Sequence, residues 1–142
     1  MNILRLIRLL LTALAIFAAG YRNLLAQTIQ VRVLDAKSGA RVPNEKVSML
    51  IKGEKNAREY TTDSEGNFSL QLEPSASLFV ATEWRVTCRT VTPGVVPFVR
   101  VSTILQEGFT VKNTCGRAKS ETVKGKLIIF ARKSSFFENF KR

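Results

Sequence analysis

Alternating hydrophobic and polar positions along much of the chain predict β-strands. In the first such stretch, Ile29, Val31 and Val33 alternate with polar residues, so one face of the strand is expected to be buried. The predicted strands that share this pattern or a β-favouring composition are Thr28–Asp35, Lys46–Lys52, Arg58–Thr62, Asn67–Leu72 and Leu78–Thr82. Pro and Gly between these stretches mark turns, so the pattern indicates an all-β fold.

Residues 59–72 combine two of these strands with a tight polar turn. Thr61 and Thr62 favour extended backbone, and Asp63–Gly66 has the composition of a turn. Apolar and polar residues then alternate from Asn67 to Leu72. We expect this segment to form the central β-hairpin of a sandwich.

The pattern is less regular after Glu83. Trp84–Thr92 either continues the preceding strand or begins another one. Apolar residues three and four positions apart in Phe98–Glu107 predict a short helix near residues 99–107 that ends at Gly108. The alternative for this segment is a further strand, Phe98–Ile104, because Val and Thr are frequent there.

The last third of the chain contains one long polar stretch and one continuous apolar run. Lys112–Lys126 is basic and irregular, which is typical of a loop. Leu127–Ala131 is apolar throughout, so we expect it to be the last and most buried strand. Ser135–Glu138 matches a capping box and predicts a short C-terminal helix that reaches Arg142.

The N-terminal residues 1–26 have the features of a signal peptide. Arg5 and Arg8 precede an uncharged apolar run, Leu9–Gly20. This run is shorter than the roughly 18 residues that a transmembrane helix needs, so we expect a cleaved leader.

Cleavage is expected after Ala26, with Gly20 as the alternative, and leaves a single domain over residues 27–142. No Cys directly follows the apolar run, so a lipid anchor would have no acceptor. The expected location is secreted or periplasmic. The alternative is an inner-membrane protein that an uncleaved leader anchors.

The chain contains two cysteines, Cys88 and Cys115. An even pair behind an export leader predicts one disulfide in an oxidising compartment. Two buried free thiols are the alternative.

The chain is basic, with 22 Lys and Arg against 11 Asp and Glu and a net charge of +11. The predicted leader holds Arg5, Arg8 and Arg22 and no acid, so the charge of the remaining chain is +8. Such a charge favours anionic surfaces such as polysaccharide or lipid headgroups, or it serves solubility alone. It does not indicate specific nucleic-acid binding.

Several short segments follow one another in an order that is known from one protein family. They are Leu34–Asp35, Ser38–Gly39, Val42–Asn44, Lys46–Ser48 and Thr61–Leu70. Together they resemble the carboxypeptidase regulatory-like domain over Thr28 to about Thr82. The resemblance implies a transthyretin-like (prealbumin-like) antiparallel β-sandwich of about seven strands. It also implies a non-catalytic role, usually in binding or structure.

From Glu83 onward the chain departs from that domain. Asn113–Gly116 and the aromatic, basic C-terminus are similar to those of small secreted bacterial proteins of unknown role that carry such a domain. The order of the later strands therefore stays open.

The chain contains no His. This excludes Ser-His-Asp and Cys-His catalysis, His-ligated zinc and a histidine general base. Hydroxyisourate hydrolase and the intradiol dioxygenases, two fold relatives of the resembled domain, depend on His and are excluded as well. We expect no cofactor and no enzymatic activity. A hydrolase that relies on carboxylates is the remaining enzymatic alternative.

Asp63, Glu65 and Asn67 place oxygen atoms at alternate positions, as the start of a calcium loop does. Gly66 stands in the fourth position of this segment, whereas a calcium loop has its Gly in the sixth. We therefore expect Asp63 to accept hydrogen bonds from turn amides, and we expect no metal site.

Two aromatic segments are candidates for contacts. Trp84 and Arg85 could form a ligand surface for sugar or phosphate, but we expect Trp84 to pack in the core against the disulfide. The C-terminal candidates for a partner contact or for peripheral membrane contact are Phe136, Phe137, Phe140, Lys141 and Arg142. The alternative is that this tail docks on the domain itself.

The function expected from the sequence is a non-enzymatic binding or interaction module whose ligand the sequence does not identify. Its partner would be an envelope protein, an anionic surface or a polysaccharide. The alternative is a carrier of carbohydrate or another small ligand, with its site between the sheets or near Trp84.

Overall fold

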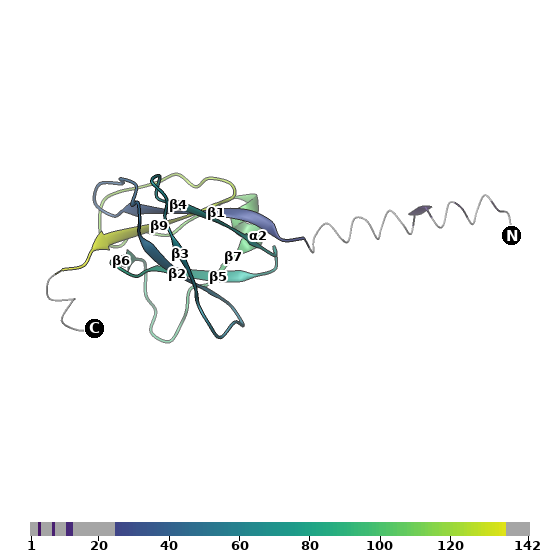
Figure 1. Ribbon diagram of the computed structural model, residues 1–142, viewed down its shortest axis with the longest axis horizontal. Coiled ribbons are helices and arrows are strands. Elements are labelled where there is room, and N and C mark those ends of the chain that lie inside the picture. The colour runs from purple at the N-terminus through teal and green to yellow at the C-terminus, as the bar shows by residue number, and fades with distance from the viewer. Residues whose placement is uncertain (1–2, 4–6, 8–10, 13–24, 136–142) are drawn as a thin grey trace.

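The computed structural model describes residues 25–135, together with residues 3, 7, 11 and 12. In this part of the chain, two β-sheets face each other and one short helix lies at one end of them (Figure 1). The elements are β1 (Gln27–Asp35), β2 (Lys46–Ile51), β3 (Arg58–Thr61), β4 (Asn67–Leu72), β5 (Ser77–Thr82), β6 (Arg85–Cys88), β7 (Val99–Arg100), α2 (Val101–Gln106), β8 (Phe109–Thr110) and β9 (Lys126–Lys133). The predicted all-β class is confirmed.

The first sheet has the strand order β4-β1-β9-β6, and β8 also pairs with β9. Residues Leu127–Ala131 of β9 are all buried. Ile129 packs in the main core, whereas Phe130 packs in a second, smaller cluster with Cys88. Because both faces of β9 are covered, the prediction of a fully buried strand here is confirmed.

The sheet is mixed, which corrects the expected antiparallel sandwich. β9 runs parallel to β1 and to β8, and antiparallel to β6. Parallel neighbours require a long crossover connection. Between β1 and β9 that connection is the whole intervening chain, which includes the second sheet.

The second sheet has the strand order β3-β2-β5-β7 and is antiparallel throughout. Its inward side chains, such as Val47 and Met49, share one core with Val31 and others of the first sheet. Tyr60 of β3 stacks on Phe68 of β4 with ring centroids 4.8 Å apart. This stack therefore connects the two sheets at one edge.

The predicted hairpin is wrong, because β3 and β4 lie in different sheets and do not pair. The Thr62 hydroxyl donates to the Val42 carbonyl at 2.7 Å and accepts from the Glu45 amide at 2.8 Å. Beyond the turn, the Gly66 carbonyl accepts from the Val33 amide in the other sheet. The alternating pattern specifies which side chains are buried. A hairpin within one sheet and two strands in facing sheets would bury the same side chains, so the pattern does not distinguish them.

The short helix predicted near residues 99–107 is confirmed as α2. Val101 and Ile104 are its buried residues. Gly108 ends it with a φ of +79°, and its amide donates to the Ile104 carbonyl at 2.9 Å. A Cβ at Gly108 would lie 2.1 Å from the Val123 carbonyl oxygen, so this helix end accepts only Gly.

The two alternatives for the segment after Thr82 are settled by β6. Glu83 and Trp84 turn the chain out of β5, and β6 then pairs with β9 in the opposite sheet. A new strand therefore begins at Arg85. The two-residue strand β7 lies within Phe98–Ile104, the segment for which a strand was the alternative to the helix, and the two-residue strand β8 was not predicted.

The predicted disulfide is confirmed, with the Cα atoms of Cys88 and Cys115 5.4 Å apart. The leader up to Leu24 and the tail from Phe136 to Arg142 lie outside the described residues, apart from the four isolated positions given above. Within the described residues, no helix reaches the length and hydrophobicity that crossing a bilayer requires.

Candidate functional site

A pocket of about 240 Å³ lies where β5 and β7 of one sheet face β8 and β9 of the other. Apolar side chains from both sheets supply most of its wall, among them Phe79, Val80, Phe98, Val99, Phe109 and Ile129. The segment that joins β6 to β7 passes over this side and contributes Arg89, Thr90 and Pro97. The volume is below the range that holds drug-sized ligands, so the pocket suits a small molecule.

Arg89 follows directly after β6 and lies in the wall of this pocket. Its guanidinium carbon lies 4.1 Å from the ring centroid of Phe79, and Nη2 donates to the Val80 carbonyl. Burial lowers the pKa of Arg89 below its ordinary value, but an arginine remains charged at neutral pH.

No ion pair joins Arg89 to a carboxylate within the described part of the chain. Partial burial of this cation costs free energy, which an anion would offset more fully than the Val80 carbonyl and the Phe79 ring do. Lys112 supplies a second cation to the same pocket. The site therefore combines an apolar body with a positive end.

The disulfide holds the two cationic segments together. Cys88 immediately precedes Arg89, and Cys115 lies three residues after Lys112. The Asn113 side chain donates to the Ala36 carbonyl at 2.7 Å and accepts from the Cys115 amide at 3.1 Å. These bonds position the loop that carries Lys112.

The Asn113–Gly116 segment is explained by this positioning role. Asn113 also donates to the Ala118 carbonyl and accepts from the Gly116 amide. A Cβ at Gly116 would lie 2.0 Å from the Ala36 carbonyl oxygen, so the close approach requires Gly.

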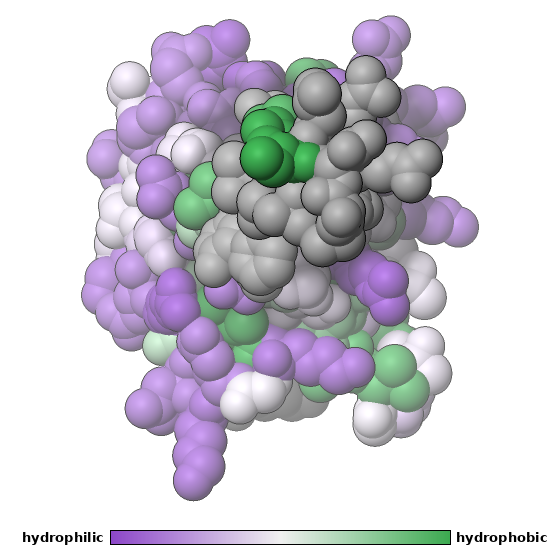
Figure 2. Space-filling model, turned by 90° about the vertical axis from the view of Figure 1, so that its right-hand side faces the viewer, coloured by the Kyte–Doolittle hydropathy of each residue, from purple (hydrophilic) through white to green (hydrophobic). Residues whose placement is uncertain are grey.

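Positive charge is concentrated in the second half of the domain. Residues 84–135 contain ten Lys and Arg against two Glu, whereas residues 27–83 contain seven against eight Asp and Glu. Where Figure 2 colours the surface, most of it is hydrophilic and the hydrophobic residues form small areas. Most of the residues that line the Arg89 pocket therefore belong to the more basic half of the domain.

Trp84 does not pack in the core against the disulfide, so that prediction is wrong. The residue is 57% exposed, and Lys46 Nζ lies 6.0 Å from the ring centroid. The disulfide is attached to Cys88 at the other end of β6. The length of this strand separates the two groups.

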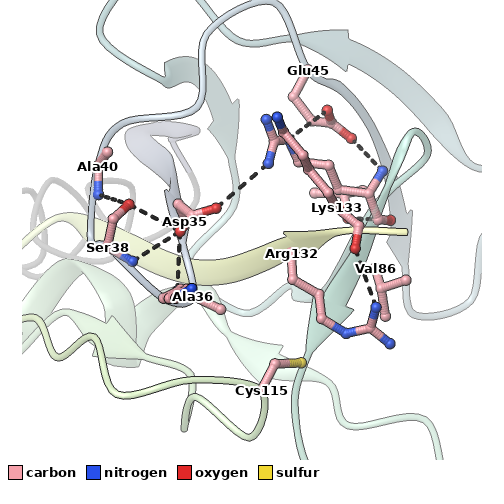
Figure 3. A network of polar contacts seen from close by, with 12 residues as sticks. Asp35, Ala36, Ser38, Ala40, Glu45, Val86, Cys115, Arg132 and Lys133 are labelled. Carbon is pink, nitrogen blue, oxygen red and sulfur yellow. Dashed lines mark hydrogen bonds and ion pairs between the residues drawn. The ribbon is translucent and has the colours of Figure 1, made fainter. Parts of the chain in front are cut away.

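The backbone at Trp84 and Arg85 is held by Glu45, one carboxylate oxygen of which accepts both amides at 3.0 Å. The Arg85 guanidinium lies 3.6 Å from the Glu45 carboxylate and 3.6 Å from the Asp35 carboxylate. Figure 3 labels these two acidic residues and marks their polar contacts with dashed lines. Burial raises the pKa of Glu45. A hydrogen bond from the Ser38 amide lowers the pKa of Asp35.

The candidate calcium ligands all have other partners in the structure. Asp63 accepts the amides of Glu65 and Asn67 at 2.9 Å, as the turn interpretation predicts. Glu65 pairs with Arg41, and the Asn67 side-chain oxygen accepts from Arg32 at 2.8 Å. These residues therefore belong to the turn that leads the chain from β3 in one sheet to β4 in the other.

The sequence raised a site between the sheets as an alternative. It did not identify Arg89 or the other residues that line this pocket. Arg89 stands in a stretch whose register the sequence left open, and Phe79, Phe98 and Phe109 lie far apart in the chain. Only the pairing of the strands brings these residues together. The candidate tail residues Phe136, Phe137, Phe140, Lys141 and Arg142 lie outside the described residues.

Comparison with known proteins adds no assignment. No protein family, curated protein or solved structure in the comparisons matches the chain.

Proposed function

We propose that the protein is a non-enzymatic binding module that holds a small ligand with an apolar body and an anionic group in the Arg89 pocket. The apolar body would lie between Phe79, Phe98 and Ile129. The anionic group would meet Arg89, with Lys112 nearby. This proposal develops the small-ligand alternative that the sequence raised.

The observation that carries this proposal is the isolated charge of Arg89. Its guanidinium is half-buried, stacks on Phe79 and has no carboxylate partner among the described residues. A ligand carboxylate or phosphate would supply the missing counter-charge through charge-assisted hydrogen bonds. Apolar walls with a few polar groups are typical of small-molecule sites.

The proposed setting is an oxidising compartment outside the cytoplasm. The Cys88–Cys115 disulfide and the leader-like N-terminus support this location. The two facing sheets are also compatible with a transthyretin-like member of the carboxypeptidase regulatory-like family. A binding role agrees with that family's usual non-catalytic use.

Calorimetric titration with octanoate and octanol tests the proposed function. These compounds differ in charge but share a similar apolar chain. The protein should bind octanoate roughly tenfold or more tightly than octanol, because a charge-assisted hydrogen bond contributes about 1.5–3 kcal/mol. Arg89→Gln should reduce this preference, with Lys112 as the remaining cation, and should weaken octanol binding less than octanoate binding.

Arg100→Gln is the matched control, since Arg100 is exposed on β7 and does not line the pocket. It should retain the preference for octanoate. Equal affinity of Arg89→Gln and the unaltered protein for octanoate would refute the role of Arg89. Binding of neither compound would refute the pocket as a site for such ligands.

A further inference from the structure

We propose a second binding site, for an acidic carbohydrate, in the hollow beside Trp84. This hollow has a volume of about 440 Å³ and lies at the end of the sandwich where the chain turns from β5 into β6. Asn44, Glu45, Trp84, Arg85 and Lys133 are in its wall. The Arg89 pocket has none of these residues in its lining.

Trp84 exposes its aromatic ring beside the hollow. It is the only Trp in the chain, and the residue is 57% exposed. Glu45 fixes the backbone on which this ring is mounted by accepting the amides of Trp84 and Arg85 at 3.0 Å. An exposed indole on a fixed backbone offers the flat apolar surface against which the C–H face of a sugar ring stacks.

Polar groups that can bind sugar oxygens lie around the Trp84 ring. Both ion pairs of Arg85 have distances of 3.6 Å, which is longer than a direct hydrogen bond. The guanidinium can therefore still donate to a ligand oxygen. Asn44 is exposed with a φ of +55°, and its side chain can donate and accept. A sugar ring requires this combination of a flat apolar surface and hydrogen-bonding groups.

The charge of the hollow selects the class of sugar. Glu45 is 3% exposed and its carboxylate is already occupied by two amides and Arg85. Lys133 in the wall and Lys46, whose Nζ lies 6.0 Å from the centroid of the Trp84 ring, add positive charge. Of the acidic neighbours, Asp35 and Glu45 are ion-paired with Arg85, and Glu83 lies close enough to Glu45 to help raise its pKa. The carboxylate of a hexuronate residue complements these cations better than a neutral hexose does.

The single Trp makes the test direct. Titration of the protein with oligogalacturonate should give a saturable change in Trp84 fluorescence, and neutral maltohexaose should give none. Measured by calorimetry, Trp84→Ala should weaken oligogalacturonate binding roughly 30-fold, the loss typical of a Trp anchor. Trp84→Phe, which retains an aromatic surface, should restore most of the affinity.

Charge controls separate a built site from general attraction to a basic protein. Lys133→Gln should weaken binding several-fold, whereas Lys55→Gln, beyond the far end of β2 from Lys46, should not. Arg89→Gln should leave oligogalacturonate binding unchanged, which keeps this site separate from the proposed function. Unaltered affinity in Trp84→Ala, or equal losses in Lys133→Gln and Lys55→Gln, would overturn the proposal.

Discussion

At the scale of single residues, backbone contacts explain why certain turns in this chain require glycine. Gly66 has a φ of +73°, and a Cβ there would lie 2.9 Å from the Val42 amide nitrogen and 3.0 Å from the Val33 carbonyl oxygen. Gly53 has a φ of +94° but no atom within 4 Å of its Cβ position. Substitution at Gly53 therefore tests the backbone strain alone, and substitution at Gly66 tests backbone strain together with steric clash.

We predict that Gly66→Ala lowers the free energy of unfolding by about 2 kcal/mol or more, and that Gly53→Ala lowers it by only about 1 kcal/mol. Both substitutions place a side chain on a residue with positive φ. At Gly66 the added Cβ would also clash with the backbone at Val33 and Val42. Urea denaturation measures both values. Octanoate affinity should be unchanged in the folded Gly66→Ala protein, and equal losses at the two sites would contradict the steric account.

Asp35 makes the stability of the turn after β1 dependent on pH. The Ser38 amide, the Lys37 amide and the Ser38 hydroxyl all donate to one of its oxygens, at 2.9–3.0 Å. These bonds favour the ionised carboxylate and lower its pKa in the folded protein. The stabilisation is therefore present above the ordinary pKa of about 4 and is lost as the pH falls through the lower folded value.

We predict that Asp35→Asn lowers the free energy of unfolding by about 1 kcal/mol at neutral pH. The difference between the two proteins should shrink as the pH falls below about 4. Denaturation curves over this range measure it, with the exposed Glu73→Gln as a control that should show little effect at any pH. A difference that is independent of pH would exclude the carboxylate charge as its cause.

At the scale of elements, the disulfide connects the end of β6 to the long loop before β9. It closes a sequence separation of 27 residues. We predict that replacing both cysteines with Ser lowers the free energy of unfolding by about 3–4 kcal/mol. Urea denaturation of the oxidised protein and of the double variant measures this, and a loss below about 1 kcal/mol would indicate that the loop is held mainly by Asn113.

Strands and buried faces could be predicted well from the sequence, but strand partners could not. Asn67–Leu72 has the predicted bounds, and the helix and disulfide were also foreseen. β3 and β4 lie in different sheets, with Thr62 bonded to the segment just before β2 and Gly66 bonded to β1, and no periodicity records such bonds. Likewise, Trp84 is exposed because of its place at a strand end, which its hydrophobicity does not reveal.

At the scale of the whole molecule, both proposed sites depend on how the two sheets meet. The Arg89 pocket lies at the open side between them, and the Trp84 hollow lies where β5 passes into β6 in the other sheet. Both sites draw cations from the basic second half of the domain. Residues 27–83 supply much of the frame, and residues 84–135 supply most of the binding groups.

The most direct test of the central claim is NMR spectroscopy of the protein with octanoate. The account predicts intermolecular nuclear Overhauser effects from the ligand's alkyl chain to Phe79, Phe98 and Ile129, together with a shift of the Arg89 guanidinium Nε–H resonance. Contacts from octanoate to other surfaces, with the Arg89 resonance unmoved, would contradict it.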